Sequence, residues 1–578
     1  MGILVFKDHS KVTGRKAARF GFQRFWGDET GSLVIFALML AMLMLMMGGI
    51  AVDVMRYESR RTSLQNTLDR STLAAAALSQ DRDAKMVVND YFLKAGLAEF
   101  LTSVTVTRGL NFRNVQATAS ADTDPLFLHM MGIDDFNANG MSMAEQRVNN
   151  VEVMLVLDVS GSMNSNSRIV NLKIAAKNFV DTVLKSDSED KISIGIVPFN
   201  GQVNLGPTLL AEFNAVNTNG VTPGQNTANV NCVDLPATAY GSASLAQYAF
   251  ATSVAPDTLS ITADADTYSG YGSMAPNGAN KWCPPQGGNI VRLPSQNILQ
   301  LQQQIDGLTA IGATSINAGM KWGAGLLDPS SRPIYSDLIG QNVIPGTLAG
   351  RPFEYTDPEA MKVIVLMTDG EHFAEDRVRD AYKTGLSGMF DSNADTFYSI
   401  FHASQVNAGT PTTLCDSRPY YVQHLNLWQS RPWNGADPVS TDCYVAGAAN
   451  GATQMTWQQV WSVMRIAYVA YYYYGVPLGF GNTTTRDSIY SANLAAMRER
   501  TQTTNMDTQL QQICTEAKLN NVIVYGIAFE APAGGQTQIR ACSTDAEKGT
   551  HFFIASGSQI GTAFSAIANN ISQLRLTQ

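Results

Sequence analysis

The stretch VMLVLDVSGSM, residues 153–163, ends an apolar run in a cluster of small oxygen-bearing side chains. Asp158, Ser160 and Ser162 occupy alternate positions in it. Gly161 lets the backbone turn tightly enough to aim all three oxygens into one small volume. On its own this motif has a second interpretation, because Asp and Ser residues also commonly cap the start of a helix.

Two further stretches carry matching side chains. TAIGATSINAGM, residues 309–320, places Thr314 in a glycine-flanked loop before a helix, and VIVLMTDGEHF, residues 363–373, ends an apolar run at Asp369. With the first motif they supply two carboxylates and three hydroxyls. Such an all-oxygen set suits a hard divalent cation, namely Mg²⁺, Mn²⁺ or Ca²⁺.

Apolar runs that alternate with amphipathic segments must position these residues. Strands are expected at 151–157, 191–199, 360–367, 521–529 and 551–556, and helices at 167–185, 295–309, 315–326, 506–519 and 558–574. This alternation predicts an α/β, Rossmann-like domain over 149–578, with a mostly parallel sheet covered on both faces. Ligands of such sheets gather at the carboxyl ends of the strands. The segments at about 201–290 and 373–500 are too long for loops and are expected to be folded insertions.

The D-x-S-x-S motif, the glycine-flanked Thr and the strand-terminal T-D-G resemble the metal-ion-dependent adhesion site, or MIDAS, of von Willebrand factor type A domains. The resemblance implies that Asp158, Ser160, Ser162, Thr314 and Asp369 hold a divalent cation. It further implies that the carboxylate of a partner protein completes the coordination of that cation. Hydroxyl ligands leave much of the cation's charge unquenched, so an external anion is attracted.

Residues 31–52 contain no charged side chain. As a helix they are about 33 Å long, enough to cross a membrane, and we expect a transmembrane helix over 29–52. A cleaved signal peptide is the alternative, although the apolar stretch is too long for one and lacks a clear cleavage site. The preceding residues, 1–28, form a basic tail that is expected to stay cytoplasmic, which places the rest of the chain outside.

Residues 53–148 are expected to form a helix followed by a small α+β unit. The segment at about 28–78 resembles the amino-terminal part of TadE/TadG-like proteins of bacterial tight-adherence (Flp-type) pilus systems. The shared features are the G-S-x-x-x-x-F-A-L opening, Asp53 and Arg56 at the membrane exit, and R-x-x-L-Q-N-x-x-D before an Ala-rich helix. Together with the downstream domain this is most similar to the TadG-like branch and implies a single-pass protein of the bacterial inner membrane. Neither Gly27 nor Gly31 has the Glu that follows a prepilin cut site, so we expect a retained anchor.

The six cysteines show no spacing suited to zinc. Sequential pairing gives Cys232–Cys283, Cys415–Cys443 and Cys514–Cys542, and disulfides agree with an exported, periplasmic domain. Six buried free thiols in a reducing compartment remain the alternative.

Composition argues against several other functions. The net charge of −9 does not favour nucleic acid as a partner. Glu371 and His372 are a possible acid/base pair, but no H-E-x-x-H or G-x-S-x-G motif supports hydrolysis, so we do not expect an enzyme. Asp264 and Asp266 are a weak candidate for a calcium loop. The run Tyr471–Tyr474 is expected to pack internally, with a glycan or partner surface as the alternative.

The sequence therefore predicts a membrane-anchored extracytoplasmic protein that supports pilus assembly and adhesion. We expect it to bind a partner's acidic group through a divalent cation at Asp158, Ser160, Ser162, Thr314 and Asp369. An adhesin that binds a host or matrix ligand directly is the alternative. A metal-dependent envelope hydrolase is the third possibility.

Overall fold

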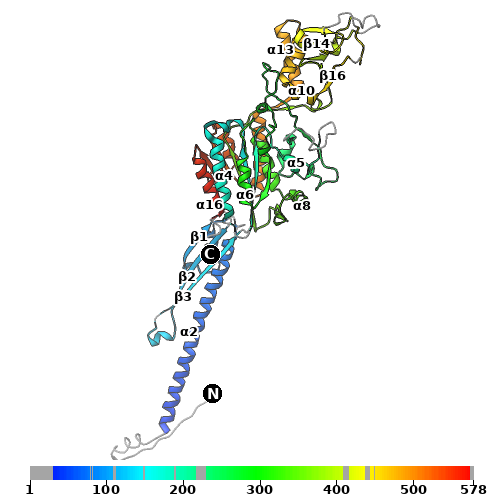
Figure 1. The fold of residues 1–578 in the computed structure, drawn as a ribbon. Coiled ribbons are helices and arrows are strands. Elements are labelled where there is room, and N and C mark those ends of the chain that lie inside the picture. Colours follow the sequence, from blue (N-terminus) through cyan, green and yellow to red (C-terminus); the bar gives the residue numbers. More distant parts are fainter. Residues whose placement is uncertain are drawn as a thin grey trace, which may run out of the picture. The chain divides into compact units, whose positions relative to one another are not determined.

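The computed structural model describes residues 30–77, 80, 82–108, 112–133, 135–147, 150–185, 187, 190–216, 230–407, 416–436, 443–447 and 450–572. The basic tail expected over 1–28 lies outside them. The chain is a mixed α/β protein of two compact units, one of residues 1–108 with 113–146 and one of 109–112 with 147–578 (Figure 1).

The first unit is built on one long helix, α2 (Thr30–Ala76), which has no Pro in its interior. Its second half packs against α3 (Ala84–Lys94) and a three-stranded sheet of order β1-β2-β3, in which β1 and β2 pair antiparallel. The strands are β1 (Leu101–Arg108), β2 (Phe112–Thr123) and β3 (Phe136–Arg147). Leu64 and Leu68 of α2 are buried together with Phe92 of α3 and Val115 of β2, which makes this half of the helix the core of the unit.

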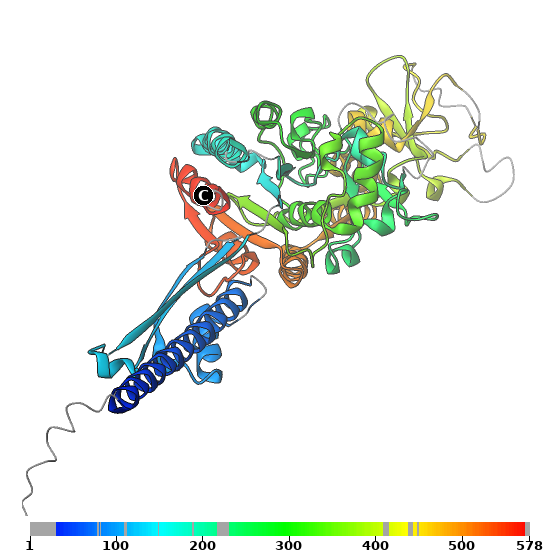
Figure 2. The same cartoon turned by 90° about the horizontal axis from the view of Figure 1, so that it is seen from below.

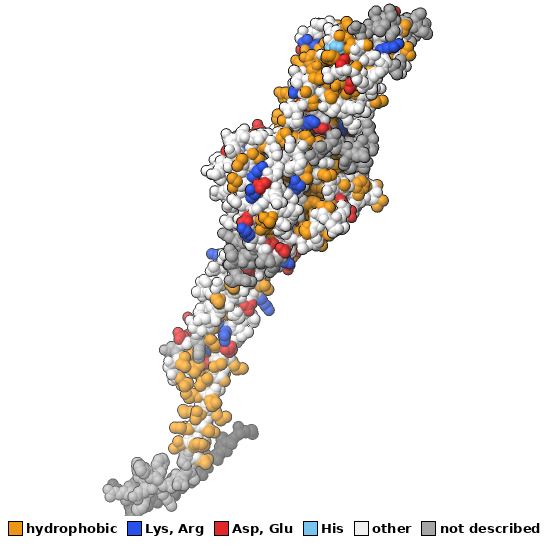
Figure 3. Space-filling model, viewed as in Figure 1, with side chains coloured by type: hydrophobic (Ala, Val, Ile, Leu, Met, Phe, Trp, Pro, Cys, Tyr) orange, Lys and Arg blue, Asp and Glu red, His pale blue; other side chains and the backbone are white. Residues whose placement is uncertain are grey.

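The first half of α2 has no such partner. From Leu33 to Gly48 its large apolar side chains are exposed, and Figure 3 shows hydrophobic atoms gathered along this part of the helix. Among the described residues this is the one helix long and apolar enough to cross a membrane.

The second unit contains a six-stranded sheet of order β19-β18-β10-β4-β5-β9. Five strands are parallel, and the edge strand β9 pairs antiparallel with β5. The strands are β4 (Asn150–Asp158), β5 (Ile192–Phe199), β9 (Arg292–Ser295), β10 (Ala360–Thr368), β18 (Ile523–Phe529) and β19 (Phe552–Ala555). The five parallel strands lie within one or two residues of those expected from the sequence.

Helices cover both faces of this sheet, as Figures 1 and 2 show. Successive side chains of a strand point to opposite faces. Leu155 and Leu157 accordingly pack under α4 (Arg168–Lys185), α6 (Ile298–Asp306) and α16 (Gln559–Ser572). Met154 and Val156 pack under the opposite layer, which consists of α7 (Ile316–Leu327), α8 (Arg332–Gly340), α14 (Thr503–Leu519) and α15 (Ala533–Cys542).

Two helix ends differ from expectation for a local reason. The helix expected at 295–309 spans Ile298–Asp306, because the Asn297 side chain caps its start by accepting the N–H of Gln300. Ser295 instead belongs to β9, and Gly307 follows the last helical residue. β9 was not expected from the sequence, because a strand of four residues gives too short a pattern to detect.

The first insertion, between β5 and β9, contains α5 (Gly206–Leu210) and a small sheet of order β6-β8-β7. Its strands are β6 (Ala215–Val216), β7 (Val233–Asp234) and β8 (Leu259–Ile261). Lys321 of α7, which is fully buried, donates from Nζ to the carbonyl oxygens of residues 242, 243 and 244 at 2.8–3.0 Å. These three bonds fix the insertion to the helical layer.

The second insertion enters on β11 (Glu375–Val378) and leaves on β17 (Arg498–Thr501), which pair with each other in an antiparallel stem. Beyond the stem lies a five-stranded sheet of order β15-β14-β13-β12-β16. Its elements are β12 (Leu386–Asp391), β13 (Tyr398–Phe401), β14 (Tyr420–Val422), β15 (Leu427–Gln429), β16 (Thr453–Thr456), α10 (Trp457–Val463), α11 (Ile466–Tyr468), α12 (Val476–Leu478) and α13 (Thr483–Met497). Both insertions are therefore folded.

Two of the three expected disulfides are present, Cys232–Cys283 and Cys514–Cys542. The first closes part of the first insertion, and the second joins α14 to α15. The third expected pair involves Cys415, which lies outside the described residues.

Candidate functional site

The register of β4 and β10 brings two of the predicted carboxylates to one edge of the sheet. These strands are parallel neighbours in which Leu157 is opposite Met367, so Asp158 and Asp369 follow at adjacent strand ends. Both are carboxyl ends, where the loops of a parallel sheet diverge. The long apolar runs before them place the acids, because each run is buried on both faces of the sheet.

Hydrogen bonds hold Asp158 in place. Its Oδ1 accepts the backbone N–H of Ser160 at 2.7 Å, and its Oδ2 accepts the hydroxyl of Thr368 at 2.5 Å. The bond from Ser160 to the Asp158 side chain closes the turn over 158–160, which the motif predicts to be tight. Thr368 was not singled out from the sequence, although it directly precedes Asp369 in the T-D-G stretch.

A chain of short contacts joins the two predicted serines to Asp369. The Oγ atoms of Ser160 and Ser162 are 2.9 Å apart, and the Ser162 hydroxyl donates to Asp369 Oδ1 at 2.7 Å. Ser160 and Asp369 are buried, whereas Ser162 is exposed. The cluster therefore opens to solvent on the Ser162 side.

Thr314 is delivered by a loop that is tied to both neighbouring loops. The N–H of Gly161 donates to the carbonyl of Gly312 at 2.9 Å, and the N–H of Phe373 donates to the carbonyl of Thr314 at 3.0 Å. Gly312 has a φ of +89°, a conformation that favours glycine. A Cβ atom at Gly370 would lie 3.7 Å from Thr314 Oγ1, which places this hydroxyl beside the residue that follows Asp369.

The Asp369 carboxylate is close enough to Asp158 to affect the ionisation of Asp158. Burial and the neighbouring Asp369 charge raise the pKa of Asp158 to about 7, although hydrogen bonds from Thr368 and Ser160 act in the opposite direction. Two buried acids side by side are unfavourable without a cation, and their pairing is therefore a feature that calls for a positive charge.

Arg168, at the first turn of α4, supplies such a charge and was missed in the sequence analysis. Its Nη1 donates to Asp369 Oδ2 at 2.8 Å, and its Nε donates to Glu530 Oε2 at 2.8 Å. Glu530 follows β18 directly and also accepts the N–H of Gly557 at 2.9 Å. The sequence does contain a signal for Glu530. It is a lone acid just after a predicted strand, as Asp369 is.

His372 braces the loop that carries Asp369. Its side chain is fully buried, its Nδ1 lies 2.7 Å from Asp507 Oδ1, and its Nε2 accepts the N–H of Asn317 at 3.1 Å. The geometry assigns a tautomer in which Nδ1 carries the proton. Glu371 is exposed, so the chain separates the two residues that were considered as an acid/base pair.

The donor set fits a hard cation. Two carboxylates and three hydroxyls meet at one strand edge, with one side open to solvent, and these are the ligand types that Mg²⁺, Mn²⁺ and Ca²⁺ take. Within the described residues no group of three or more His, Cys, Asp or Glu side chains is placed to hold a metal ion, so the candidate site depends on its hydroxyl ligands as well as its two carboxylates.

The other candidates have structural roles. Asp266 is fully buried and accepts backbone N–H groups from Tyr268 and Asn277, while Arg465 lies 3.2 Å away. Asp264 pairs with Lys281. In the tyrosine run, which lies in a π-helix over Val469–Gly475, Tyr473 is buried and Tyr471 stacks on Tyr271 with ring centroids 3.8 Å apart.

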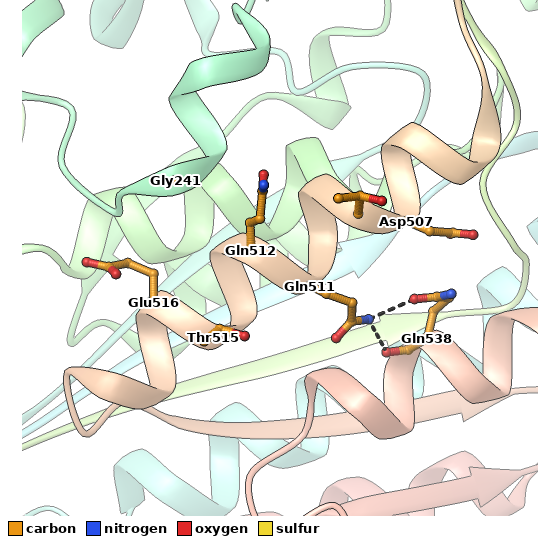
Figure 4. Close-up of a pocket in the computed structure, with 8 residues that line it drawn as sticks. Gly241, Asp507, Gln511, Gln512, Thr515, Glu516 and Gln538 are labelled. Carbon is orange, nitrogen blue, oxygen red and sulfur yellow. Dashed lines mark hydrogen bonds between the residues drawn. The ribbon is translucent and has the colours of Figure 1, made fainter.

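A polar groove of about 610 Å³ runs along α14 (Figure 4). Gln511 spans its wall to α15, donating to the backbone carbonyl of Gln538 at 3.0 Å and to its side-chain oxygen at 2.8 Å. Asp507, the partner of His372, lies at one end. At that end the groove borders the residues that support the Asp369 loop. Its lining side chains are amides, hydroxyls and two acids, Asp507 and Glu516, and they do not converge on one point (Figure 4).

The raised pKa of Asp158 predicts a pH dependence of cation binding. A carboxyl whose folded-state pKa is raised is stabilised in its protonated form, so ionisation between about pH 4 and pH 7 lowers the stability of the folded protein. A cation needs the ionised form. We expect the rise in Tm caused by Mn²⁺ to be small near about pH 5.5 and to grow through about pH 8. Calorimetry in Mn²⁺ and in EDTA measures this, and an equal shift at both pH values would contradict it.

Arg168 should weaken cation binding, because its charge lies on one of the proposed ligands. Arg168→Gln is expected to tighten Mn²⁺ binding about tenfold, which corresponds to roughly 1.4 kcal/mol. The variant removes the repulsion between the arginine and the cation, and it frees the Asp369 carboxylate to bind the cation. Lys185→Gln removes the same charge from the far, exposed end of α4 and should leave the Kd unchanged. Titration calorimetry distinguishes the two variants, and weaker binding in Arg168→Gln would show that the arginine supports the site.

Comparison with known proteins agrees with the amino-terminal resemblance. Residues 31–78 match the family model described as "Putative Flp pilus-assembly TadE/G-like". The prediction made for residues 28–78 is confirmed, and this segment of the chain is TadE/G-like. No curated protein matches the chain.

Solved structures that are similar to the chain include three pilus proteins. The pilus adhesin SpaC of Lactobacillus rhamnosus GG, in its open conformation, is 10% identical with a TM-score of 0.28, and the match covers 81% of this chain and 33% of SpaC. The von Willebrand factor domain of the type V pilus tip protein Mfa5 of Porphyromonas gingivalis is 14% identical with a TM-score of 0.29. The match covers 74% of this chain and 96% of that domain. The adhesive tip pilin GBS104 of Group B Streptococcus agalactiae is 10% identical with a TM-score of 0.28. The match covers 73% of this chain and 100% of the GBS104 chain. The chain spans about a third of the length of SpaC.

Proposed function

We propose that this chain is a membrane-anchored, extracytoplasmic protein of a tight-adherence pilus system, which binds the acidic group of a partner through a divalent cation. The observation that carries the proposal is the cluster at the ends of β4 and β10. Asp158, Ser160, Ser162 and Asp369 form one hydrogen-bonded group with Thr314 on the adjoining loop. The five residues come from three separate stretches of sequence.

In this proposal Asp158 and Asp369 supply the negative charge, and Ser160, Ser162 and Thr314 supply neutral oxygens. A bound Mg²⁺, Mn²⁺ or Ca²⁺ would offer an open coordination position to an external carboxylate. Thr368, His372 and the turn at Gly161 hold the ligands in place, and Arg168 shares Asp369 with the cation. The arrangement is the MIDAS type that the sequence motifs resemble.

The amino-terminal segment and the disulfides support the proposed location. The TadE/G-like segment and the exposed apolar half of α2 support an inner-membrane anchor. The basic residues before α2 support a cytoplasmic amino terminus and a periplasmic second unit. The two disulfides described above agree with an oxidising compartment.

A second candidate, direct adhesion to a host or matrix ligand, is favoured by the position of the insertions. Asn200, which begins the first insertion, accepts the N–H of Ser315 at 2.7 Å, next to Thr314. The second insertion begins just after the Asp369 loop. The two insertions meet where Glu375 accepts hydrogen bonds from the side chains of Gln202 and Trp282. Two folded insertions beside the site offer a surface large enough for a macromolecular ligand.

Replacing Asp158 with Ala in the producing cell tests both candidates. Loss of surface pili, with the protein still present in the membrane, supports assembly. Normal pili with lost adhesion support the adhesin. The matched control is Asp306→Ala, which removes an exposed carboxylate that pairs with Lys177 on the surface and should change neither property. Pili and adhesion that both remain normal in Asp158→Ala would contradict a role of the site in either.

A biochemical experiment addresses the metal bridge itself. The full chain is solubilised from the membrane in Mg²⁺, captured with its bound proteins and washed with EDTA. A partner that leaves with EDTA, and that Asp158→Ala never captures, supports a metal-bridged contact. A partner that stays bound in EDTA shows that the contact does not use a cation.

A further inference from the structure

The connection between β2 and β3 is fixed to α2 at the level where the apolar part of the helix ends. Asp53 is the first charged residue after the uncharged run, and it is buried. Its carboxylate accepts the backbone N–H groups of Leu126, Phe127 and Leu128 at 2.9, 2.7 and 2.9 Å. Three bonds to one carboxylate satisfy donors that would otherwise be left open in a loop. Asp53 is therefore the anchor of this connection.

Gly49, one helical turn earlier, gives the loop room to approach. A Cβ atom there would lie 2.4 Å from Cγ of Phe127, which any side chain larger than glycine would displace. The Phe127 ring thus lies against the backbone of α2 inside the apolar stretch. Figure 1 shows the connection beside the half of α2 that has no sheet next to it.

The outer face of this connection is largely apolar. Residues 125–133, PLFLHMMGI, contain no Asp, Glu, Lys or Arg. Leu128 is buried, while Met130 is 85% exposed. The other exposed apolar side chains of the connection are Leu126, Phe127, Met131 and Ile133. Five exposed large apolar side chains on one short segment are more than a water-facing turn carries by chance.

We propose that residues 125–133 insert into the interfacial layer of the lipid bilayer, as a second membrane contact beside α2. The apolar surface of the helix and that of the connection meet at Gly49 and Phe127, so one continuous surface faces the same medium. The exposed acids Asp124 and Asp135 flank the segment and stay in water, which limits the insertion to the interface. The inference rests on α2 crossing the bilayer and is independent of the cation site.

Three variants of the full chain, each with one added cysteine that carries a nitroxide label, test the proposal in vesicles of phosphatidylethanolamine and phosphatidylglycerol. Met130→Cys reports on the connection. Met143→Cys is the matched water-side control, since Met143 is also exposed and the neighbouring Ser142 contacts Thr72, about 28 Å along α2 from Asp53. Met42→Cys reports on the exposed apolar half of α2. The described native cysteines are not free, so they do not compete with the added thiol for the label.

Collision rates of each label with oxygen and with a water-soluble nickel chelate give the result. We expect the label at 130 to lose most of the nickel-chelate collisions seen at 143 and to gain oxygen collisions toward the level at 42. Nickel access at 130 equal to that at 143 would overturn the proposal. Spin–spin broadening at 130 would also overturn it, because it would show a second copy of the chain on this surface. A label at 42 that is open to the nickel chelate would instead refute the membrane span.

Discussion

Replacing Asp158 with Asn is expected to lower the affinity for Mn²⁺ by at least about 100-fold, roughly 2.7 kcal/mol, because the cation loses one of its two charged ligands. The same change is expected to stabilise the metal-free protein near about pH 8 by about 2 kcal/mol. A neutral amide removes one of two adjacent buried charges, and its oxygen still accepts the N–H of Ser160.

Both effects are measurable on the full chain in detergent. Titration calorimetry gives the affinity, and thermal unfolding in EDTA gives the change in stability. Asp306→Asn, which alters an exposed carboxylate, should leave both unchanged. An Asp158→Asn protein that binds Mn²⁺ normally would contradict the assignment of the site. A metal-free variant less stable than the parent would show that Asp158 is held for structural reasons.

Glu152→Ala is expected to lower the free energy of unfolding by about 3–5 kcal/mol, the usual effect of breaking a buried ion pair. Glu152 lies on β4 at the end of the sheet away from the site. Its Oε2 is 2.5 Å from Lys362 Nζ, its Oε1 is 3.7 Å from Arg351 Nη1, and all three side chains are buried. Burial lowers the pKa of Lys362, and Glu152 opposes that effect. Without Glu152 two buried cations lose their counter-charge.

Glu354→Ala is the matched control, since Glu354 pairs with Arg332 at 2.9 Å on the surface and should contribute less than about 1 kcal/mol. Urea unfolding followed by near-ultraviolet circular dichroism measures both variants. Equal midpoints for the two would show that the buried pair is replaceable without cost.

The parallel strands and the positions of the predicted ligands follow from local patterns. The apolar runs of β4 and β10 are long enough to identify buried strands, and the residue after such a strand is fixed at the sheet edge. Asp158 and Asp369 are predictable for that reason. Their proximity needs one further piece of information, that β4 and β10 are neighbours, which only the strand order shows.

Arg168 and Glu530 are not predictable in the same way. Arg168 looks like an ordinary basic residue at the start of an amphipathic helix. It meets Asp369 and Glu530 because the first residue of α4 lies beside the residues that follow β10 and β18. The Gly49–Phe127 contact has the same character, since it joins residues far apart in the chain. Contacts of this kind arise from packing, whereas the sequence patterns report on one segment at a time.

The stem of the second insertion has a consequence for how such a protein can change. Val378 and Arg498, where the insertion begins and ends, are paired residues of adjacent antiparallel strands, so they lie about 5 Å apart. Asp376 holds the stem shut through Arg498 and Arg500. A segment with neighbouring ends can be exchanged as a cassette while the sheet and its five oxygen donors stay as they are. The insertion can then vary without a change in the proposed cation ligands.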